Sequence, residues 1–380
     1  MARPAVEVWT SGALPAMTQD LRTLVELETP SHDKALLDTG LAAIHSLLAD
    51  RLGTPGELHR YDGRAHGDVL EVTYPGELPG FVLFLCHYDT VWPEGTLAGW
   101  PFEVSGNRAG GPGAFDMKLG LVQAIWALRC VRELGLPVPT VKLLLTGDEE
   151  IGSPMSRPHV ERLSEGALAT LVFEASLDGA LKTGRKGVGL FDVTVRGVEA
   201  HAGLEPQAGV SAIHQLAELV PGIAALADPA LGTSVNVGLI AGGTGRNVVA
   251  GEATCGIDVR VAAPEEAARL DAAFAGLTPS DPRATLTVDG GWNRPPMVPN
   301  PASQRLFKLA HGVGADLGLA LGEVSVGGAS DANFVSALGR PVLDGLGAVG
   351  AGAHARHEHV LLDHVPVRTA LVAELLTALA

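Results

Sequence analysis

The hydrophobic pattern of this chain changes twice, near Lys186 and again near Pro295. Before the first change, short apolar runs alternate with segments of helical periodicity, and such an alternation predicts an α/β sheet with parallel pairs. The runs are residues 81–85, 141–145 and 169–173, and the clearest helical segment is residues 116–134. Two helices are also predicted near the start, at residues 18–27 and 33–52, with Ser31 as the cap of the second.

Between the two changes, apolar and polar residues alternate, which is typical of strands exposed on one face. The predicted elements are a strand at 188–196, a helix at 206–226, strands at 234–240 and 254–261, a helix at 265–277 and a strand at 284–288. This is the split-βαβ order of a complete, ferredoxin-like α+β domain. Afterwards the first pattern returns, with a helix at 303–319, a strand at 341–346 and a helix at 366–379.

We therefore predict one α/β domain formed by residues 1–185 and 295–380, with the smaller domain, residues 186–294, inserted into it. The α/β domain is expected to hold a mixed, largely parallel sheet flanked by helices and to carry catalysis. A chain of 380 residues is long enough for both domains.

The composition excludes several classes of partner. The formal charge is −16, whereas nucleic acids and anionic membrane surfaces bind basic faces. No uncharged apolar stretch approaches the roughly 20 residues of a membrane span, and no signal-peptide pattern is evident at the start. The three cysteines, Cys86, Cys130 and Cys255, have no CxxC spacing, so we interpret them as reduced core thiols of a cytoplasmic protein.

Acids and histidines cluster where open α/β sheets bind ligands, after the buried strands. They are His87 and Asp89, the run Asp148-Glu149-Glu150, and Glu174; Asp116 opens a predicted helix. Two histidines with three or four carboxylates suit zinc, with cobalt or manganese as substitutes, and the lack of a cysteine ligand argues against a structural zinc. Four C-terminal histidines compete for one ligand role, and the pattern leaves that choice open: His354, His357, His359 and His364.

Each of these side chains has a second interpretation. Asp89 can accept the second ring hydrogen of His87, as carboxylates behind metal-bound histidines do, or the pair can be a surface ion pair. Asp116 can bridge two metals or cap the helix that it opens. The adjacent acids 148–150 repel one another unless a cation or proton neutralises them, so they combine a metal ligand with a proton shuttle or form a solvated turn.

Together these segments resemble the metallopeptidase family that includes carboxypeptidase G, acetylornithine and succinyl-diaminopimelate deacylases, and aminoacylase. The resemblance runs through nearly the whole chain, with the motifs in family order. The matching segments are His87-Tyr88-Asp89-Thr90, Asp116-Met117-Lys118, Asp148-Glu149-Glu150, Glu174, Arg185-Lys186-Gly187, Ala200-His201-Ala202-Gly203, residues 243–249, Asp258-Val259-Arg260, Arg294-Pro295-Pro296, and His354 followed four residues later by Glu358.

The resemblance implies two divalent metal ions, with zinc expected before cobalt or manganese. It implies that Asp116 bridges the ions and that four residues complete them, His87 and Glu174 on one ion and Glu150 and His354 on the other. Asp89 would orient His87. Glu149 would be the general base, taking a proton from the metal-bridging water and giving it to the leaving amine.

The resemblance also implies roles for the inserted domain. His201 would reach the active site of a partner subunit and stabilise the oxyanion, in a homodimer formed through a sheet edge and a helix of the inserted domain. Asn247, Arg260 and Arg294 match positions that contact the substrate's carboxylate, for which the two-pronged guanidinium is suited. Gly328 lies in a segment that resembles the family's glycine-rich substrate loop.

The predicted function is therefore metal-dependent hydrolysis of the amide bond of N-acyl or peptidyl amino acids, next to a free carboxylate. The alternatives are a dipeptidase, an aminopeptidase or an N-acyl amino acid deacetylase on the same scaffold. Outside enzymes, the alternative is an amino-acid-binding module. Arg260 and Arg294 favour recognition of a carboxylate over recognition of an amine.

Overall fold

The computed structural model describes residues 3–379, which form two compact units. The larger unit contains the residues up to Gly184, Pro299–Ser325, and the residues from Ser330 on. The smaller unit contains Arg185–Val298 and Val326–Ala329. The domain boundaries placed after residues 185 and 294 stay predictions about which parts fold on their own.

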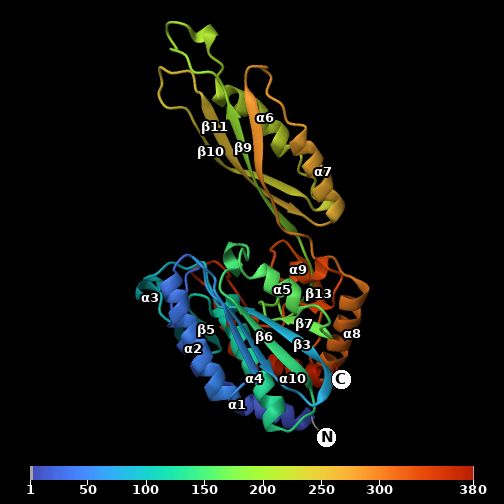
Figure 1. Ribbon diagram of the computed structural model, residues 1–380. Helices are drawn as coiled ribbons and strands as arrows, with labels where there is room; N and C mark the ends of the chain where they lie inside the picture. The colour runs from blue at the N-terminus through green and yellow to red at the C-terminus, as the bar shows by residue number, and fades with distance from the viewer. Residues whose placement is uncertain (1–2, 380) are drawn as a thin grey trace. The chain divides into compact units, whose positions relative to one another are not determined.

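A six-stranded sheet lies at the centre of the larger unit (Figure 1). Its order is β1 (Glu57–Tyr61), β2 (Val69–Tyr74), β6 (Pro139–Thr146), β3 (Leu78–His87), β7 (Ala169–Val172) and β14 (Val342–Leu343). β3 pairs in parallel with β6 and β7, and β7 pairs in parallel with β14, whereas β1 and β2 add antiparallel pairs at one edge. The prediction of a mixed, largely parallel sheet is confirmed.

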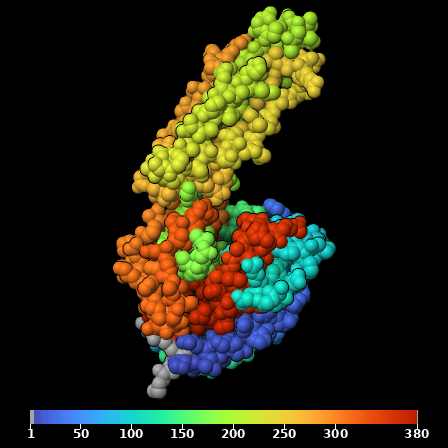
Figure 2. Space-filling model, turned by 180° about the vertical axis from the view of Figure 1, so that it is seen from behind, coloured from blue at the N-terminus to red at the C-terminus, as the bar shows by residue number. Residues whose placement is uncertain are grey.

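Four long helices of the larger unit pack together: α1 (Arg3–Val25), α2 (Lys34–Leu52), α4 (Leu119–Glu133) and α10 (Val365–Ala378). The contact between α1 and α10 places the first and last helices side by side, and Figure 2 shows the blue and red ends of the chain next to each other. α1 is longer than the helix predicted at residues 18–27, because it continues through Pro15 back to Arg3. A proline in a helical pattern suggests a helix end, and the predicted helix began after Pro15.

The larger unit also contains a second, small sheet in the order β15 (Gly350–Ala351), β16 (His359–Leu361), β5 (Arg108–Gly110) and β4 (Glu103–Ser105). β8 (Leu181–Arg185) pairs with β13 (Glu323–Val326). The remaining helices are α3 (Thr96–Gly99), α5 (Arg157–Leu163), α8 (Pro301–Asp316) and α9 (Ala332–Ala337). The pairing of β16 with β5 brings the C-terminal segment beside the loop that leads into α4.

The cap of α2 differs from the prediction. Asp33, not Ser31, is the N-cap, and its side chain accepts the Leu36 N–H at 3.0 Å. The Ser31 hydroxyl instead donates to Oδ2 of Asp89 at 2.8 Å. The assignment of Ser31 was wrong because its partner is distant in the sequence and a local pattern does not reveal it.

The smaller unit is an antiparallel sheet with two helices on one face (Figure 1). The strand order is β10 (Ser234–Gly242), β11 (Glu252–Val261), β9 (Gly187–Arg196) and β12 (Thr285–Arg294), and the helices are α6 (Ala212–Ala224) and α7 (Pro264–Ala275). Inward residues such as Val193 and Val259 share one core with Leu216 of α6 and Leu270 of α7. The strand and helix order is that of the predicted ferredoxin-like fold.

Cys86, Cys130 and Cys255 are free thiols and are buried, as expected for core residues. Burial raises the pKa of Cys130 to about 12, which keeps the thiol protonated. Within the described residues, every helix falls short of the length or apolarity that a membrane crossing requires.

Candidate metal centre

His87 is the last residue of β3, and its ring lies among carboxylates. The Nε2 atom lies 3.3 Å from Oδ1 of Asp116 and 3.4 Å from Oε1 of Glu174. The Nδ1 atom lies 3.0 Å from the backbone carbonyl oxygen of Asp89 and 3.4 Å from its side-chain Oδ1. An Nδ1–H donated to Asp89 leaves the Nε2 lone pair facing the acids, as a metal ligand requires.

The Asp89 carboxylate is fully buried and also holds the turn that follows β6. Its Oδ1 accepts the backbone N–H of Glu149 at 3.2 Å, and its Oδ2 accepts that of Glu150 at 3.1 Å. The Ser31 hydroxyl donates to the same Oδ2. Asp89 therefore aligns the end of β3 with the neighbouring turn, in addition to contacting His87.

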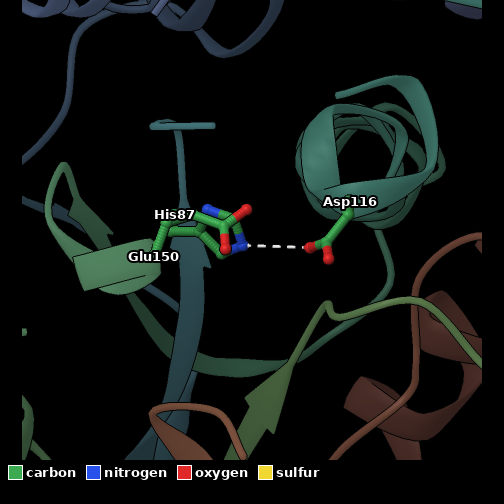
Figure 3. Close-up of side chains that lie close together, drawn as sticks. All are labelled: His87, Asp116 and Glu150. Carbon is green, nitrogen blue, oxygen red and sulfur yellow. Dashed lines mark hydrogen bonds and ion pairs between the residues drawn. The ribbon is translucent and has the colours of Figure 1, made fainter. Parts of the chain in front are cut away.

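Asp116 lies in the turn η1 (Ala114–Lys118), directly before α4, and its two oxygens face two histidines. Oδ1 lies 3.3 Å from Nε2 of His87, and Oδ2 lies 3.4 Å from Nε2 of His354. Figure 3 shows the side chains of His87, Asp116 and Glu150 directed toward one another from three separate elements. A carboxylate between two imidazoles in this way is placed to bridge two cations.

Glu149 and Glu150 begin the 3₁₀ turn η2 (Glu149–Ile151), at the carboxyl end of β6. Oε2 of Glu150 lies 3.1 Å from Nε2 of His354. The ligand atoms of His87, Glu149 and Glu174 lie within 4.8 Å of one another, as do those of His87, Asp116 and Glu150. The three parallel strands thus bring the acids to one sheet edge, as their positions after buried strands predicted.

His354 reaches the centre from the turn before β16, and its side chain is 52% exposed. Its φ of 59° is left-handed, which is uncommon for a residue other than glycine and is frequent at functional sites. The two ligand groups found among the described residues include none of the four C-terminal histidines, so the choice among them rests on their distances to the carboxylates. Of the four C-terminal histidines, the structure brings His354 to Asp116 and Glu150.

Asp148, the first acid of the run 148–150, has a structural role. Oδ2 of Asp148 accepts the backbone N–H groups of Met155 and Ser156, at 2.7 and 3.1 Å. Burial raises the pKa of Asp148 above its ordinary value, against these hydrogen bonds. Asp148 therefore organises the segment between η2 and α5.

The centre gathers several carboxylates, and the pKa values of Glu150, His354 and His87 are all raised there. Burial raises the pKa of Glu150 to about 7, and the nearby Asp116 charge adds to the shift. Hydrogen bonds to Asp116 and Glu150 raise the pKa of His354 to about 11. Burial lowers the pKa of His87, but its carboxylate partners, Asp116 first, outweigh burial and raise it. A divalent cation would compensate the same charge in place of these protons.

Glu358 lies directly behind the centre, and sequence reasoning assigned it no role of its own. Its buried carboxylate accepts the backbone N–H of Asp116 at 3.0 Å. Burial raises the pKa of Glu358, although the N–H donors around it favour the charged form. The only signal in the sequence is its position four residues after His354.

A cavity of about 350 Å³ opens beside Glu150. Its lining combines apolar side chains, among them Val91 and Ile151, with the acids Asp33 and Glu94. The cavity lies wholly within the larger unit and provides room for a small group next to the ligand cluster.

His201 lies in the smaller unit, where its exposed ring has a defined tautomer. The Nδ1 atom accepts the backbone N–H groups of Gly203 and Leu204, both at 3.1 Å. A neutral ring therefore carries its hydrogen on Nε2, which is a hydrogen-bond donor. The backbone carbonyl of Asn247 accepts the N–H of Ala202 at 2.9 Å, so the backbone segments that carry Asn247 and His201 pair with each other.

The other predicted substrate contacts also lie in the smaller unit. Arg294 is buried at the end of β12. Arg260 makes two hydrogen bonds to Asp258, at 2.8 and 2.7 Å, within its own strand β11. The carbonyl oxygen of Gly328 accepts a hydrogen bond from Arg185 at 3.0 Å. Arg260 is thus engaged by a neighbouring carboxylate, which weakens the case for its contact with substrate.

Comparison with known proteins matches this geometry to a family. The model of peptidase family M20/M25/M40 matches residues 83–378. The chain is 30% identical to carboxypeptidase G2 of Pseudomonas sp. (strain RS-16) over 375 residues, covering 95% of this chain and 89% of that protein. It is 30% identical to succinyl-diaminopimelate desuccinylase of Xanthomonas campestris pv. campestris (strain 8004) over 365 residues, covering 89% and 94%. The crystal structure of aminopeptidase PepT from Bacillus cereus ATCC 10987 shares the fold, with a TM-score of 0.79 at 22% identity, covering 96% of this chain and 98% of that chain.

The chain belongs to peptidase family M20/M25/M40. The family predicted from the motifs is confirmed, and so is the prediction that the protein is a hydrolase of the peptidase and deacylase type. The alternative of a non-catalytic binding module finds no support in these likenesses.

Proposed function

We propose that this chain is a two-metal amide hydrolase in which Asp116 bridges two divalent ions, zinc in the first place, with cobalt or manganese as substitutes. One metal position, the His87 position, is formed by His87 and Glu174. The other, the His354 position, is formed by Glu150 and His354. The observation that carries the proposal is that the two oxygens of Asp116 lie 3.3 and 3.4 Å from the ring nitrogens of two histidines. Imidazole and carboxylate ligands without cysteine suit a catalytic zinc site.

Two divalent ions bound there supply Lewis-acid chemistry, because they polarise an amide carbonyl and lower the pKa of water. Glu149 is the proposed general base. It lies beside His87 and Glu174, and the hydrogen bond from its backbone to Asp89 fixes its turn. In this role its carboxylate accepts a proton from the attacking water and delivers it to the leaving amine nitrogen.

The proposed substrates are N-acyl or peptidyl amino acids with a free carboxylate beside the cleaved amide. The names of two relatives, a carboxypeptidase and a desuccinylase, support this class. Arg294 is the better candidate for the carboxylate contact, because Arg260 is engaged by Asp258. Asn247 and Gly328 remain proposed contacts on the resemblance of their segments alone.

We further propose that His201 stabilises the oxyanion in the active site of a second copy of the chain. The hydrogen on its Nε2 suits it as a donor, since Nδ1 is occupied by backbone N–H groups. The sheet-edge part of the proposed dimer contact, which also involves a helix, is the edge strand β10, where Leu239 is 75% and Ile240 65% exposed. Exposed apolar edge strands favour pairing with another chain.

A hydrolysis assay with matched substrates tests the proposed function. Metal-depleted protein is offered an N-acyl glutamate and its α-methyl ester, each with and without added zinc, cobalt or manganese. We expect cleavage of the free acid only, lost in the presence of a chelator and restored by zinc, because the reaction needs both the ions and the carboxylate contact. Release of glutamate is the measurement.

Two results would contradict the proposal. Undiminished cleavage in the presence of chelator would exclude a role for the metals. Cleavage of dipeptides that depends on a free amine and not on a free carboxylate would favour the aminopeptidase alternative.

The cytoplasmic location predicted from the cysteines stays a prediction, which cell fractionation tests.

A further inference from the structure

Glu358 is a buried carboxylate, 1% exposed, and it accepts four N–H groups. Its Oε2 accepts the indole N–H of Trp92 at 3.0 Å and the backbone N–H of Gly113 at 3.1 Å. Its Oε1 accepts the backbone N–H groups of Phe115 at 2.8 Å and Asp116 at 3.0 Å. Each oxygen therefore accepts two hydrogen bonds, and this one side chain accepts three backbone N–H groups of the loop that carries Asp116.

The loop bonds some N–H groups to its own carbonyls, Ala114 to Gly111 at 3.1 Å and Lys118 to Gly113 at 3.0 Å. Glu358 accepts those of Gly113, Phe115 and Asp116. Gly113 adopts a φ of +74°, and the turn at Asp116 has non-helical dihedral angles. Buried N–H groups that lose their acceptor carry a free-energy penalty, so a change at Glu358 should displace the loop.

Glu358 also belongs to the turn that carries His354. Its backbone N–H donates to the Ala355 carbonyl at 2.9 Å, and the Ala355 N–H donates to the Gly352 carbonyl at 2.9 Å. The turn is tight, since a Cβ atom on Gly352 would lie 2.9 Å from the backbone of Glu358. The backbone of Glu358 thus closes the His354 turn while its side chain holds the Asp116 loop.

The two metal positions differ in how their ligands are held. His87 ends β3, and Glu174 follows β7, so both are placed by adjacent strands of the central sheet. His354 lies on an irregular turn between β15 and β16. Its distance of 3.4 Å from Asp116 therefore depends on what joins that turn to the Asp116 loop.

We propose that Glu358 is a positioning residue: it ties the turn of His354 to the loop of Asp116 and sets the metal affinity of the His354 position more strongly than that of the His87 position. This inference rests on the proposed two-metal function. Glu358 touches neither ion nor substrate in this role and acts through the backbones of the two ligand-bearing segments.

The test compares Glu358→Gln with the matched control Glu28→Gln in the full-length, metal-depleted protein. A glutamine at 358 presents an NH₂ group to one pair of N–H donors, so that pair loses its acceptor. Glu28 is a fair control because its carboxylate also accepts two backbone N–H groups, of Gly95 and Leu97, both at 2.8 Å. Those two donors belong to the start of α3 and not to a segment that carries a proposed ligand.

Titration with zinc by calorimetry, and with cobalt by absorption spectroscopy, measures the two affinities. We expect the unchanged protein and the Glu28→Gln variant to bind two ions. In Glu358→Gln the first ion should bind nearly as before and the second about 10–100-fold more weakly. Glu358→Asp keeps the negative charge, but its shorter side chain moves the carboxylate away from the N–H donors. We expect a loss of affinity for the second ion that is smaller than in Glu358→Gln. Without metal, amide hydrogen exchange in residues 111–118 should be faster in Glu358→Gln than in Glu28→Gln.

The outcomes separate this inference from the proposed function. If the unchanged protein binds fewer than two ions, the two-metal function fails. If it binds two, and Glu358→Gln binds both as tightly as the control, the positioning role alone is wrong. Circular dichroism checks that each variant folds. If Glu358→Gln does not fold, metal affinities in Glu358→Asp equal to those of the unchanged protein would overturn the positioning role of Glu358.

Discussion

At the residue scale, three consecutive acidic residues have separate roles, which their contacts define. Asp148 bonds to backbone N–H groups, whereas Glu150 faces His354 at 3.1 Å. The carboxylate of Glu149, the residue between them, lies within 4.8 Å of the ligand atoms of His87 and Glu174. The sequence places all three acids after one strand, and the conformation of η2 then directs each side chain to a different partner.

Exchange of Glu149 for glutamine separates proton transfer from metal binding. Glu149→Gln should retain both ions, because it is not among the proposed ligands, and should lower kcat by about 10²–10⁴-fold through loss of the general base. Steady-state kinetics and metal analysis of the same preparation are the measurements. Glu150→Ala is the contrasting variant, and its bound metal should fall. Near-normal turnover in Glu149→Gln would refute the assignment.

At the element scale, the site depends on the close approach of α4 to the end of β7. Gly120 lies in the first turn of α4, and a Cβ atom there would lie 1.9 Å from the carbonyl oxygen of Phe173. Phe173 directly precedes Glu174, and α4 directly follows the loop of Asp116. The absence of a side chain at position 120 thus allows two ligand-bearing segments to approach each other.

Gly120→Ala should therefore destabilise the larger unit by about 1–3 kcal/mol, as overpacking does, and weaken metal binding. Gly312→Ala is the control, because a Cβ atom on Gly312 in α8 would have no described atom within 4 Å apart from its chain neighbours and the nearby backbone of its own helix. The control should stabilise by about 0.5–1 kcal/mol, through helix propensity. Chemical unfolding followed by circular dichroism measures both effects. Equal stability of the two variants would show that the contact at Gly120 is unimportant.

At the scale of the whole molecule, the sheet of the smaller unit ends in the edge strand β10. β10 pairs with β11 on one side only, and it carries the exposed side chains of Leu239 and Ile240. Proteins usually protect such edges with charge, and an apolar edge is suited to a partner. A homodimer through β10 would cover these side chains and is compatible with the proposed role of His201 in a second copy.

Leu239→Glu should convert the proposed dimer to a monomer, because it places a charge in the contact. Light scattering after gel filtration measures the change. Leu58→Glu is the control, since Leu58 is also exposed but lies on β1 of the larger unit. A monomeric unchanged protein, or a dimeric Leu239→Glu, would contradict the proposed interface.

Mixed dimers test the role of His201 directly. Glu149→Gln and His201→Ala should each be nearly inactive alone, and co-expression should restore part of the activity if His201 serves the partner's site. Leu239→Glu introduced into both chains should abolish the recovery. Recovery that is independent of dimerisation would exclude the exchange of His201.

The amino-acid sequence by itself determined the architecture and the family. Continuous apolar runs identified β3, β6 and β7, and strict alternation identified the strands of the smaller unit, because both patterns arise from neighbours within one element. The same reasoning did not find β1, β2 or the small sheet of β4, β5, β15 and β16. β1 is exposed along most of its length and so lacks an apolar run. The others are short or carry buried polar residues such as Glu71, so their pairing depends on distant partners.

The tertiary structure alone decided which side chains meet. It brought His354 to Asp116, directed Ser31 to Asp89, engaged Arg260 with Asp258 and placed Glu358 behind the metal centre. Each of these contacts except that of Arg260 joins segments far apart in the chain. A local pattern reports which residues share a helix face or a strand, whereas contacts between distant segments follow from how the elements pack.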